Sequence, residues 1–495
     1  MVVQHNMQAA NANRMLNVTT SAQSKSTEKL SSGYRINRAA DDAAGLTISE
    51  KMRKQIRGLD QASTNAQDGV SSVQTAEGAL TEVHSMLQRM NELATQAANG
   101  TNSKDSDRQA IQDEIEQLTT EIDRVSETTK FNETYLLKGD AGTKAINLKA
   151  HDAGLKGTLT DNGDGTATFT MNELKAGDSV SIGGKTYKIG ASTKELKDML
   201  TKADIDNKQT DVVINGDTYK YKAALAPDTT STNKKDGYAA GWYKDGKTPD
   251  DTGAGTVHDA TYSNAADIAQ KVKAGTVEVG PDKLTIITDN DNDGVDDNDV
   301  SVISKEKAYT LAAGELLKAN QIGDTNNQAK VGIGDTYTAM TLNNATNSIK
   351  IHAGQAQVAN SLAFSLHVGA DADMTNKIQV NIDAMDSASL GIKGLNVKDD
   401  SGNAATYAVD AISDAISKVS SQRSSLGAVQ NRLEHTINNL DNVVENTTTA
   451  ESRIRDTDMA EEMVNYSKNN ILAQAGQSML AQANQSNQGV LSLLQ

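Results

Sequence analysis

The longest regular pattern in the sequence is an apolar stripe in its N-terminal part. Between residues 52 and 97, apolar side chains recur at steps of three or four: Met52, Ile56, Leu59, Ala62, Ala66, Val70, Val73, Ala76, Leu80, Val83, Leu87, Met90, Ala94 and Ala97. This spacing places one side chain per turn on one side of a helix, and over such a length it is typical of a coiled-coil seam. A single helix cannot bury its own stripe, so the pattern predicts a long helix packed against partner helices.

Two further stripes supply candidate partners for this helix. Asn99 and Gly100 are suited to end the first helix, and Ser106 with Gln109 is typical of a capping box that begins the next one. The second stripe consists of Ile111, Ile115, Leu118, Ile122 and Val125, and the third of Ile412, Ile416, Val419, Leu426, Val429, Leu433, Ile437, Leu440 and Val444. We expect the first two helices to be antiparallel and all three stripes to form a bundle. The two ends of the chain must then meet in space.

The middle of the chain has a different composition. All three prolines lie there, together with Trp242 and most of the glycine and tyrosine. Residues 180–189 and 212–221 each read as a hairpin around a tight turn, whereas residues 194–200 and 265–273 read as short helices. Residues 145–358 are therefore predicted to be a β-rich insert that comprises two small α/β modules.

The extreme ends carry only thin apolar faces. Residues 1–32 and 458–495 are rich in Asn, Gln and Ser. A lone helix of this kind is marginal in water. We expect both ends to be disordered in the free chain and to fold when partner subunits cover them. The alternative is that the two ends pack on one another within a single chain.

Composition excludes several classes of function. The chain has no cysteine, which rules out disulfides, zinc–thiolate sites and cysteine nucleophiles. Its net charge of -17 argues against nucleic acid as a partner. No apolar run approaches the ~20 residues that span a bilayer. The polar N-terminus lacks the apolar stretch of a signal peptide, which taken alone favours a cytoplasmic protein.

Several segments at both ends resemble one known family. Residues 30–49 are similar to the signature segment of bacterial flagellins, and residues 121–125 with Phe131 and Asn132 resemble the end of the family's N-terminal helical domain. The C-terminal resemblance covers residues 366–370, 388–392, 424–433, 471–484 and 490–494. The likeness is long and ordered at both ends and does not extend into the middle.

The resemblance implies a nested architecture of discontinuous N- and C-terminal helices. Terminal coiled-coil segments would occupy residues 1–43 and 457–495, and a helical bundle domain residues 44–144 and 359–456. Residues 145–358 would form an outward-projecting α+β insert. The family is exported unfolded by a type III apparatus, which accounts for the missing signal peptide, and it forms the extracellular flagellar filament.

A non-enzymatic filament subunit is therefore the expected function. The implied partners are further copies of the chain, an export chaperone, and cap and junction proteins. Residues on the terminal faces are the candidates for polymerisation: Val3, Met7, Leu16, Leu472, Met479, Val490 and Leu494. The alternatives are a hook–filament junction protein and a glycan-binding adhesin, in which Trp242 and Tyr243 would stack on sugars.

A second set of residues matches the surface that flagellins present to the Toll-like receptor that senses them. The matching residues are Gln88, Arg89, Leu93, Gln96, Ile111, Glu114 and Arg432. Arg89, Leu93 and Gln96 lie one residue off the apolar stripe, about 100° round the helix, so we expect them to be exposed. Leu93 could then anchor a partner. Packing between neighbouring subunits would explain the same face.

One acidic run in the insert resembles a calcium-binding loop. Asp289, Asp291, Asp293 and Asp297 occupy ligand positions one, three, five and nine of the EF-hand pattern. The bidentate glutamate at position twelve is replaced by Val300, and a simple acidic turn explains the run equally well. The seven histidines form no zinc-protease motif, and there is no phosphate loop or nucleophile elbow.

Overall fold

The computed structural model describes residues 6–99, 101, 106–227, 236–247, 257–399 and 402–492. It divides into two compact units. The first unit comprises Met1–Gln74, Ala363–Asn381 and Ser425–Gln495, and the second Thr75–Leu362 and Ile382–Ser424. Two long helices, α2 (Ala43–Ala97) and α9 (Asn403–Arg455), contribute residues to both units. No helix in the described part of the chain is long and apolar enough to cross a membrane.

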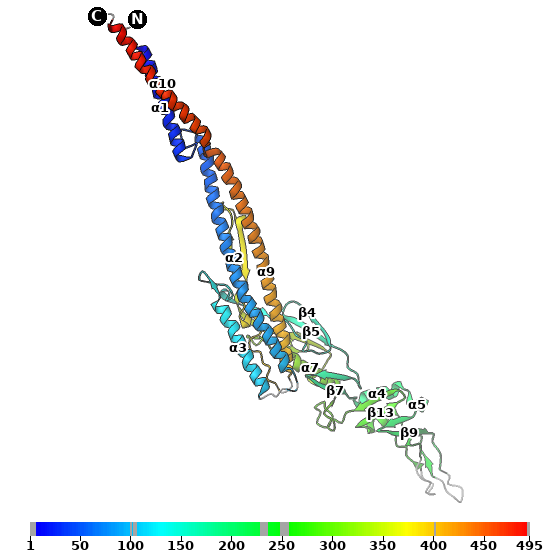
Figure 1. Cartoon of the computed structure of the whole chain (residues 1–495). Helices are drawn as coiled ribbons and strands as arrows, with labels where there is room; N and C mark the ends of the chain where they lie inside the picture. Colours follow the sequence, from blue (N-terminus) through cyan, green and yellow to red (C-terminus); the bar gives the residue numbers. More distant parts are fainter. Residues whose placement is uncertain are drawn as a thin grey trace. The chain divides into compact units, whose positions relative to one another are not determined.

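The first unit contains the two terminal helices. Helix α1 (Met7–Ser32) lies beside α10 (Met459–Ser492), as the blue and red ribbons in Figure 1 show. The described parts of both ends are therefore largely helical and in contact within one chain. This differs from the expected disorder and matches the alternative prediction, because each thin apolar face gives the other a partial partner.

A β-hairpin packs against α2 and α9 in the same unit. Its strands are β19 (Leu362–His367) and β20 (Lys377–Ile382), joined through the short 3-10 helix η1 (Met374–Asn376). The small core beneath it consists of Ala66, Val368, Ile378 and Leu433. The hairpin approaches α2 closely at Gly69, where an added Cβ would lie 2.2 Å from Leu366 Cδ1.

In the second unit, α3 (Asp107–Thr128) runs antiparallel to α2. Arg89 on α2 pairs with Glu114, and Arg108 reaches back to the carbonyl of Ala97. The predicted antiparallel pair is thus observed, but the predicted capping box is wrong. The Ser106 side chain makes no capping bond and donates to Asp107 instead, and Gln109 donates to Asp113 rather than reaching back.

Short strands and a helical turn lie around this helix pair. They are β1 (Lys130–Phe131) with β2 (Thr134–Tyr135), β3 (Asp140–Asn147) with β18 (Gln355–Asn360), and α8 (Ser387–Leu390). On α9, Arg423 occupies a position in an otherwise apolar stripe. Its Nη2 lies 3.7 Å from Oε1 of Glu77 on α2.

The insert contains two hydrophobic clusters. The first is centred on α7 (Lys305–Asn320) and two small sheets. Their strands are β4 (Gly157–Asp161), β5 (Thr166–Met171), β16 (Lys330–Gly332) and β17 (Ser348–His352) in one sheet, and β6 (Ser179–Ile182), β7 (Lys185–Ile189) and β15 (Val302–Ile303) in the other.

The second cluster lies between short helices and a five-stranded sheet. Its helices are α4 (Thr193–Lys202), α5 (Ile205–Lys208) and α6 (Ala265–Lys271). The sheet order is β11 (Gly241–Lys244), β9 (Asp217–Lys222), β8 (Val212–Ile214), β13 (Gly275–Val279) and β14 (Asp282–Ile286). A separate parallel pair joins β10 (Gly237–Tyr238) and β12 (Val257–His258).

The predicted local elements of the insert are confirmed. Strands β6 and β7 form one predicted hairpin, and β8 and β9 form the other around Asn215 and Gly216, both at positive φ. Such an Asn-Gly turn matches the twist of the flanking strands. Terminal helical regions with a central β-containing insert are thus the observed fold class. The exact domain boundaries drawn from the sequence stay a prediction.

Candidate functional site

The terminal helices contact each other near both ends of α1. The Asn6 side chain donates to the Ala483 carbonyl at 3.1 Å, and Lys29 Nζ lies 3.8 Å from a Glu462 carboxylate oxygen. At Gly476, an added Cβ would lie 3.3 Å from Leu16 Cδ1, so this glycine allows the two helices to approach closely.

Most apolar side chains of this pair remain exposed. Among the described residues of the two helices, only Ser26 of α1 and Ala473 of α10 are buried. The exposed apolar residues range from 48% for Leu472 to 74% for Met7. They are Met7, Met15 and Val18 on α1, and Met459, Met463, Val464, Ile471, Leu472 and Met479 on α10. Water-exposed apolar area of this extent is typical of a surface that binds a partner.

Two grooves lie on this surface. One, of about 750 Å³, is bordered by both helices and includes Met15, Leu16, Leu472 and Met479 in its walls. The other, of about 540 Å³, lies on α10 alone, where Met463, Val464, Ile471 and Leu472 provide most of the lining. Both grooves are therefore mostly apolar and open to the outside.

The predicted polymerisation residues lie on this surface where they are described. Met7, Leu472 and Met479 are exposed, and Leu16 is half-buried between the helices. Val490 belongs to α10, but its side chain is not described. Val3 and Leu494 lie outside the described residues.

The residues predicted to contact a receptor do not all reach the surface. Gln88, Arg89, Gln96 and Glu114 are exposed, and Arg89 Nε lies 2.9 Å from a Glu114 oxygen. Ile111 is buried, as its place in the second stripe indicated. Arg432 is exposed on the part of α9 that belongs to the first unit.

The prediction that Leu93 is exposed is wrong. Its exposed fraction is 2%, so it cannot act as an accessible anchor in this conformation. The physical reason is that α2 has neighbours on more than one side in the second unit. Glu77 contacts α9, and Arg89 contacts α3. The buried sector of α2 is therefore wider than the single stripe from which exposure was inferred.

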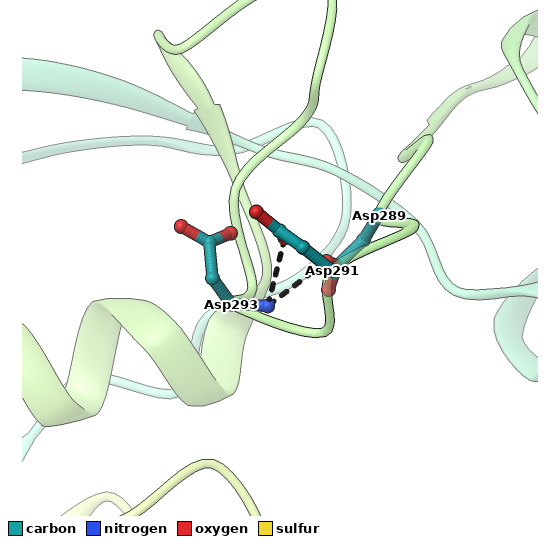
Figure 2. Close-up of side chains that lie close together, drawn as sticks. All are labelled: Asp289, Asp291 and Asp293. Carbon is teal, nitrogen blue, oxygen red and sulfur yellow. Dashed lines mark hydrogen bonds between the residues drawn. The ribbon is translucent and has the colours of Figure 1, made fainter.

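The acidic run of the insert folds as a turn. Ligand atoms of Asp289, Asp291 and Asp293 lie within 4.8 Å of one another. Figure 2 shows the backbone N–H of Asp293 donating to the carboxylates of both Asp289 and Asp291. The Asp289 carboxylate also accepts from Gly294, and Lys307 Nζ lies 3.9 Å from Asp293 Oδ2.

Asp297, the fourth predicted ligand, is engaged elsewhere. Its carboxylate accepts from the backbone and the side chain of Asn290, and it is not part of the three-aspartate group. Backbone amides and a lysine ammonium already partner the cluster, so the geometry favours an acidic turn. Calcium binding at these residues stays a prediction.

Trp242 and Tyr243, the two residues proposed to stack on sugars, are not displayed on the surface. Trp242 is 1% exposed and donates its indole N–H to the Thr210 carbonyl, and Tyr243 is 3% exposed. Trp242 belongs to the second hydrophobic cluster of the insert. The adhesin alternative depended on these two rings being free to stack on sugars, and both are buried.

Comparison with known proteins identifies the family. Residues 3–141 match the bacterial flagellin N-terminal helical region, and residues 409–494 match the bacterial flagellin C-terminal helical region. A curated flagellin of Clostridium tyrobutyricum is 36% identical over 99% of this chain and 100% of its own. The chain belongs to the flagellin family. A second flagellin, from Bacillus subtilis, is 34% identical over the full length of both chains.

Family membership decides several of the sequence-based predictions. A flagellin is a structural protein and not an enzyme, and flagellins form the extracellular flagellar filament by association of like subunits. This chain is accordingly a flagellar filament subunit. A solved structure of FliC from Burkholderia pseudomallei shares 18% identity and covers 74% of this chain and 99% of its own. Its TM-score of 0.22 is too low to compare the two architectures.

Proposed function

We propose that this flagellin polymerises through the apolar faces of α1 and α10, which neighbouring subunits cover in the filament. The observation that carries the proposal is the exposure of nine large apolar side chains on the described part of these two helices. Full burial of one such side chain stabilises an interface by roughly 1.5–3 kcal/mol. The terminal pair therefore holds enough unburied apolar area to drive association.

The surface offers two different faces, which an open polymer requires. One of the two grooves involves both helices and the other only α10, so the exposed faces of the pair are not equivalent. When one face of a subunit binds a different face of its neighbour and the rotation does not close, repetition produces a helical filament.

Seeded elongation tests the proposal with a matched pair of variants. Leu472→Ser combined with Met479→Ser removes two exposed apolar side chains from the larger groove. We expect its critical concentration for elongation to rise by at least about tenfold, which corresponds to roughly 1.4 kcal/mol. Val300→Ser, at a 77% exposed position of the insert, should elongate like the wild type.

Deletion of residues 458–495 provides the stronger version of the same test. This truncation removes α10 and leaves the insert intact. It should yield soluble protein that adds to no seed at any salt concentration. Normal filaments from the truncated chain would refute assembly through the terminal helices.

We further propose that a host Toll-like receptor recognises the exposed residues Gln88, Arg89, Gln96 and Glu114. The support is their shared exposure on α2 and α3 and the Arg89–Glu114 ion pair, which presents a defined polar surface. Arg89→Ala should weaken receptor activation by monomer in a reporter assay. Arg124→Ala removes another exposed, ion-paired arginine of α3 and serves as the control. Equal activation by both variants would contradict the proposal.

Export in an unfolded state completes the proposed function. The absence of cysteine supports it, since no crosslink can hinder threading through a narrow channel. An export chaperone and the cap and junction proteins are the corresponding partners. A chain with an engineered disulfide between α2 and α9 should fail to be secreted under oxidising conditions and recover when reductant is added.

A further inference from the structure

The two breaks between long helices lie side by side in the first unit. Helix α1 is joined to α2 by residues 33–42, and α9 to α10 by residues 456–458. The Arg35 N–H donates to the Arg455 carbonyl at 2.7 Å, and the Thr457 N–H donates to the Gly33 carbonyl at 3.0 Å. The α1–α2 and α9–α10 connections, which are far apart in sequence, are thereby tied together at one joint.

Tyr34 lies at the centre of this joint. Its backbone forms an isolated bridge with Asp456, and two guanidinium groups lie over its ring. Arg455 Cζ is 4.8 Å from the ring centroid and Arg53 Cζ is 5.7 Å from it. Arg53 also donates to the Tyr34 hydroxyl at 3.3 Å. One aromatic ring therefore joins the end of α9 to the beginning of α2.

Both arginines have anionic partners, and the hydrogen bonding of Arg455 is incomplete. Arg455 Nη1 lies 2.7 Å from a Glu50 oxygen, and Arg53 Nε lies 3.4 Å from Glu451, which is 8% exposed. The Arg455 side chain is 14% exposed, and its buried Nε has no hydrogen-bond partner. A buried donor without a partner is costly, and the electron-rich face of an aromatic ring offsets part of that cost.

We propose that Tyr34 is a positioning residue for subunit assembly. Its ring, shared by Arg53 and Arg455, fixes the direction in which α1 and α10 leave α2 and α9. The inference rests on the proposed assembly through α1 and α10.

The physical reason is preorganisation. Every subunit of a helical filament must present its binding faces in the same geometry, and a loose joint would have to be ordered when a subunit docks. A contact that fixes the joint beforehand strengthens docking without touching the neighbouring subunit.

The experiment compares three single variants in seeded elongation. Tyr34→Leu keeps apolar bulk but removes the ring, whereas Tyr34→Phe keeps the ring and loses only the hydroxyl. Tyr135→Leu is the control, because Tyr135 is a 44% exposed tyrosine with Lys138 Nζ 5.5 Å from its ring, outside the joint. We expect the critical concentration to rise about tenfold for Tyr34→Leu, to stay within about twofold for Tyr34→Phe, and to stay unchanged for the control.

A second measurement separates positioning from general destabilisation. The helicity of monomeric Tyr34→Leu should equal that of the wild type, and its thermal midpoint should lie close to the wild-type value, because Tyr34 belongs to none of the three hydrophobic clusters named above. If that variant unfolds, Arg455→Lys tests the same contact from the other side. Lysine keeps the charge facing Glu50 but loses the planar group that stacks on a ring. It should raise the critical concentration as well.

Two results would overturn the inference. Elongation of Tyr34→Leu or Arg455→Lys with the critical concentration of the wild type would show that the ring contact positions nothing. An equal loss in Tyr34→Phe and Tyr34→Leu would assign the effect to the hydroxyl instead. The truncation of residues 458–495 belongs in the same assay. Filaments from the truncated chain refute assembly through the terminal helices, whereas a blocked truncation with normal Tyr34→Leu refutes only the role of Tyr34.

Discussion

Arg108 shows how a single buried charge can hold separate chain segments together. Its side chain is 2% exposed, and it donates to the carbonyls of Ala97 at 2.9 Å and Asp399 at 2.7 Å. The guanidinium thus ties the C-terminal end of α2 to the segment that precedes α9. The carbonyls at a helix end lack intrahelical partners, and a cation there satisfies them.

Arg108→Met should therefore lower the free energy of unfolding. We expect a loss of about 2–3 kcal/mol, because charge-assisted hydrogen bonds disappear and buried carbonyls lose their partners. Urea unfolding monitored by circular dichroism measures the change. Arg124→Met, at an exposed ion pair of the same helix, should shift stability by less than about 0.5 kcal/mol. Similar losses in the two variants would contradict the assigned role.

His151 makes stability depend on pH. Burial lowers the pKa of His151 from its usual value of 6.5, and nearby Asp414 and Asp410 oppose the shift while Lys149 adds to it. The unfolded chain then binds more protons than the folded chain just below pH 6.5, so stability falls as pH falls through that window.

Unfolding midpoints in urea between pH 7.5 and 5.5 test this effect. The urea midpoint of the wild type should decrease as the pH is lowered from 7.5 to 5.5. The decrease should be smaller in His151→Asn, because asparagine cannot take up the proton. Burial raises the pKa of Asp410, which acts in the opposite direction at lower pH, so the comparison stops at pH 5.5. Identical slopes for both proteins would exclude His151 as the cause.

At the scale of elements, the sequence predicts whatever is encoded locally. The stripes of α2, α3 and α9 and the Asn215-Gly216 hairpin follow from periodicity and turn chemistry. Helix α7 was missed, because its core face is built largely of small residues such as Ala308 and Ala312 inside a β-rich segment. Its N-cap, Ser304, was the available signal.

Features that depend on contacts distant in sequence could not be predicted. Leu93 is buried because α2 has more than one neighbour, and the Tyr34 joint brings together residues more than 400 positions apart, including Arg455. Neither arrangement leaves a trace in spacing or composition. Most of the candidate assembly surface, by contrast, could be predicted from the sequence. Its apolar residues recur with a helical period even where they stay exposed.

Two glycines of α2 give a matched test of close packing at this scale. Gly69→Ala would bring a Cβ within 2.2 Å of Leu366 Cδ1 and 3.3 Å of Leu433 Cδ1, so the Leu366 side chain must leave its packed position. We expect a loss of about 1–2 kcal/mol of stability despite the better helix propensity of alanine. Gly78→Ala meets nothing within 4 Å and should gain up to about 1 kcal/mol. Equal gains at both positions, measured by thermal unfolding, would refute the packing.

In the molecule as a whole, the apolar faces of the terminal helices are only partly buried. The described parts of α1 and α10 pair with each other, yet they bury only Ser26 and Ala473. The net charge of -17 keeps free subunits apart, so salt should promote assembly by screening. The filament would then complete the burial that one chain cannot provide.

Methionine oxidation would show whether neighbouring subunits cover the faces of α1 and α10 in the filament. Met7, Met463 and Met479 are exposed on the terminal helices, whereas Met90 is fully buried in the single chain. Brief treatment with peroxide, read by mass spectrometry, converts accessible methionine to its sulfoxide. We expect rapid oxidation of Met7, Met463 and Met479 in monomer, strong protection of these three in filament, and protection of Met90 in both. Equal oxidation of Met7, Met463 and Met479 in monomer and filament would contradict the proposed coverage.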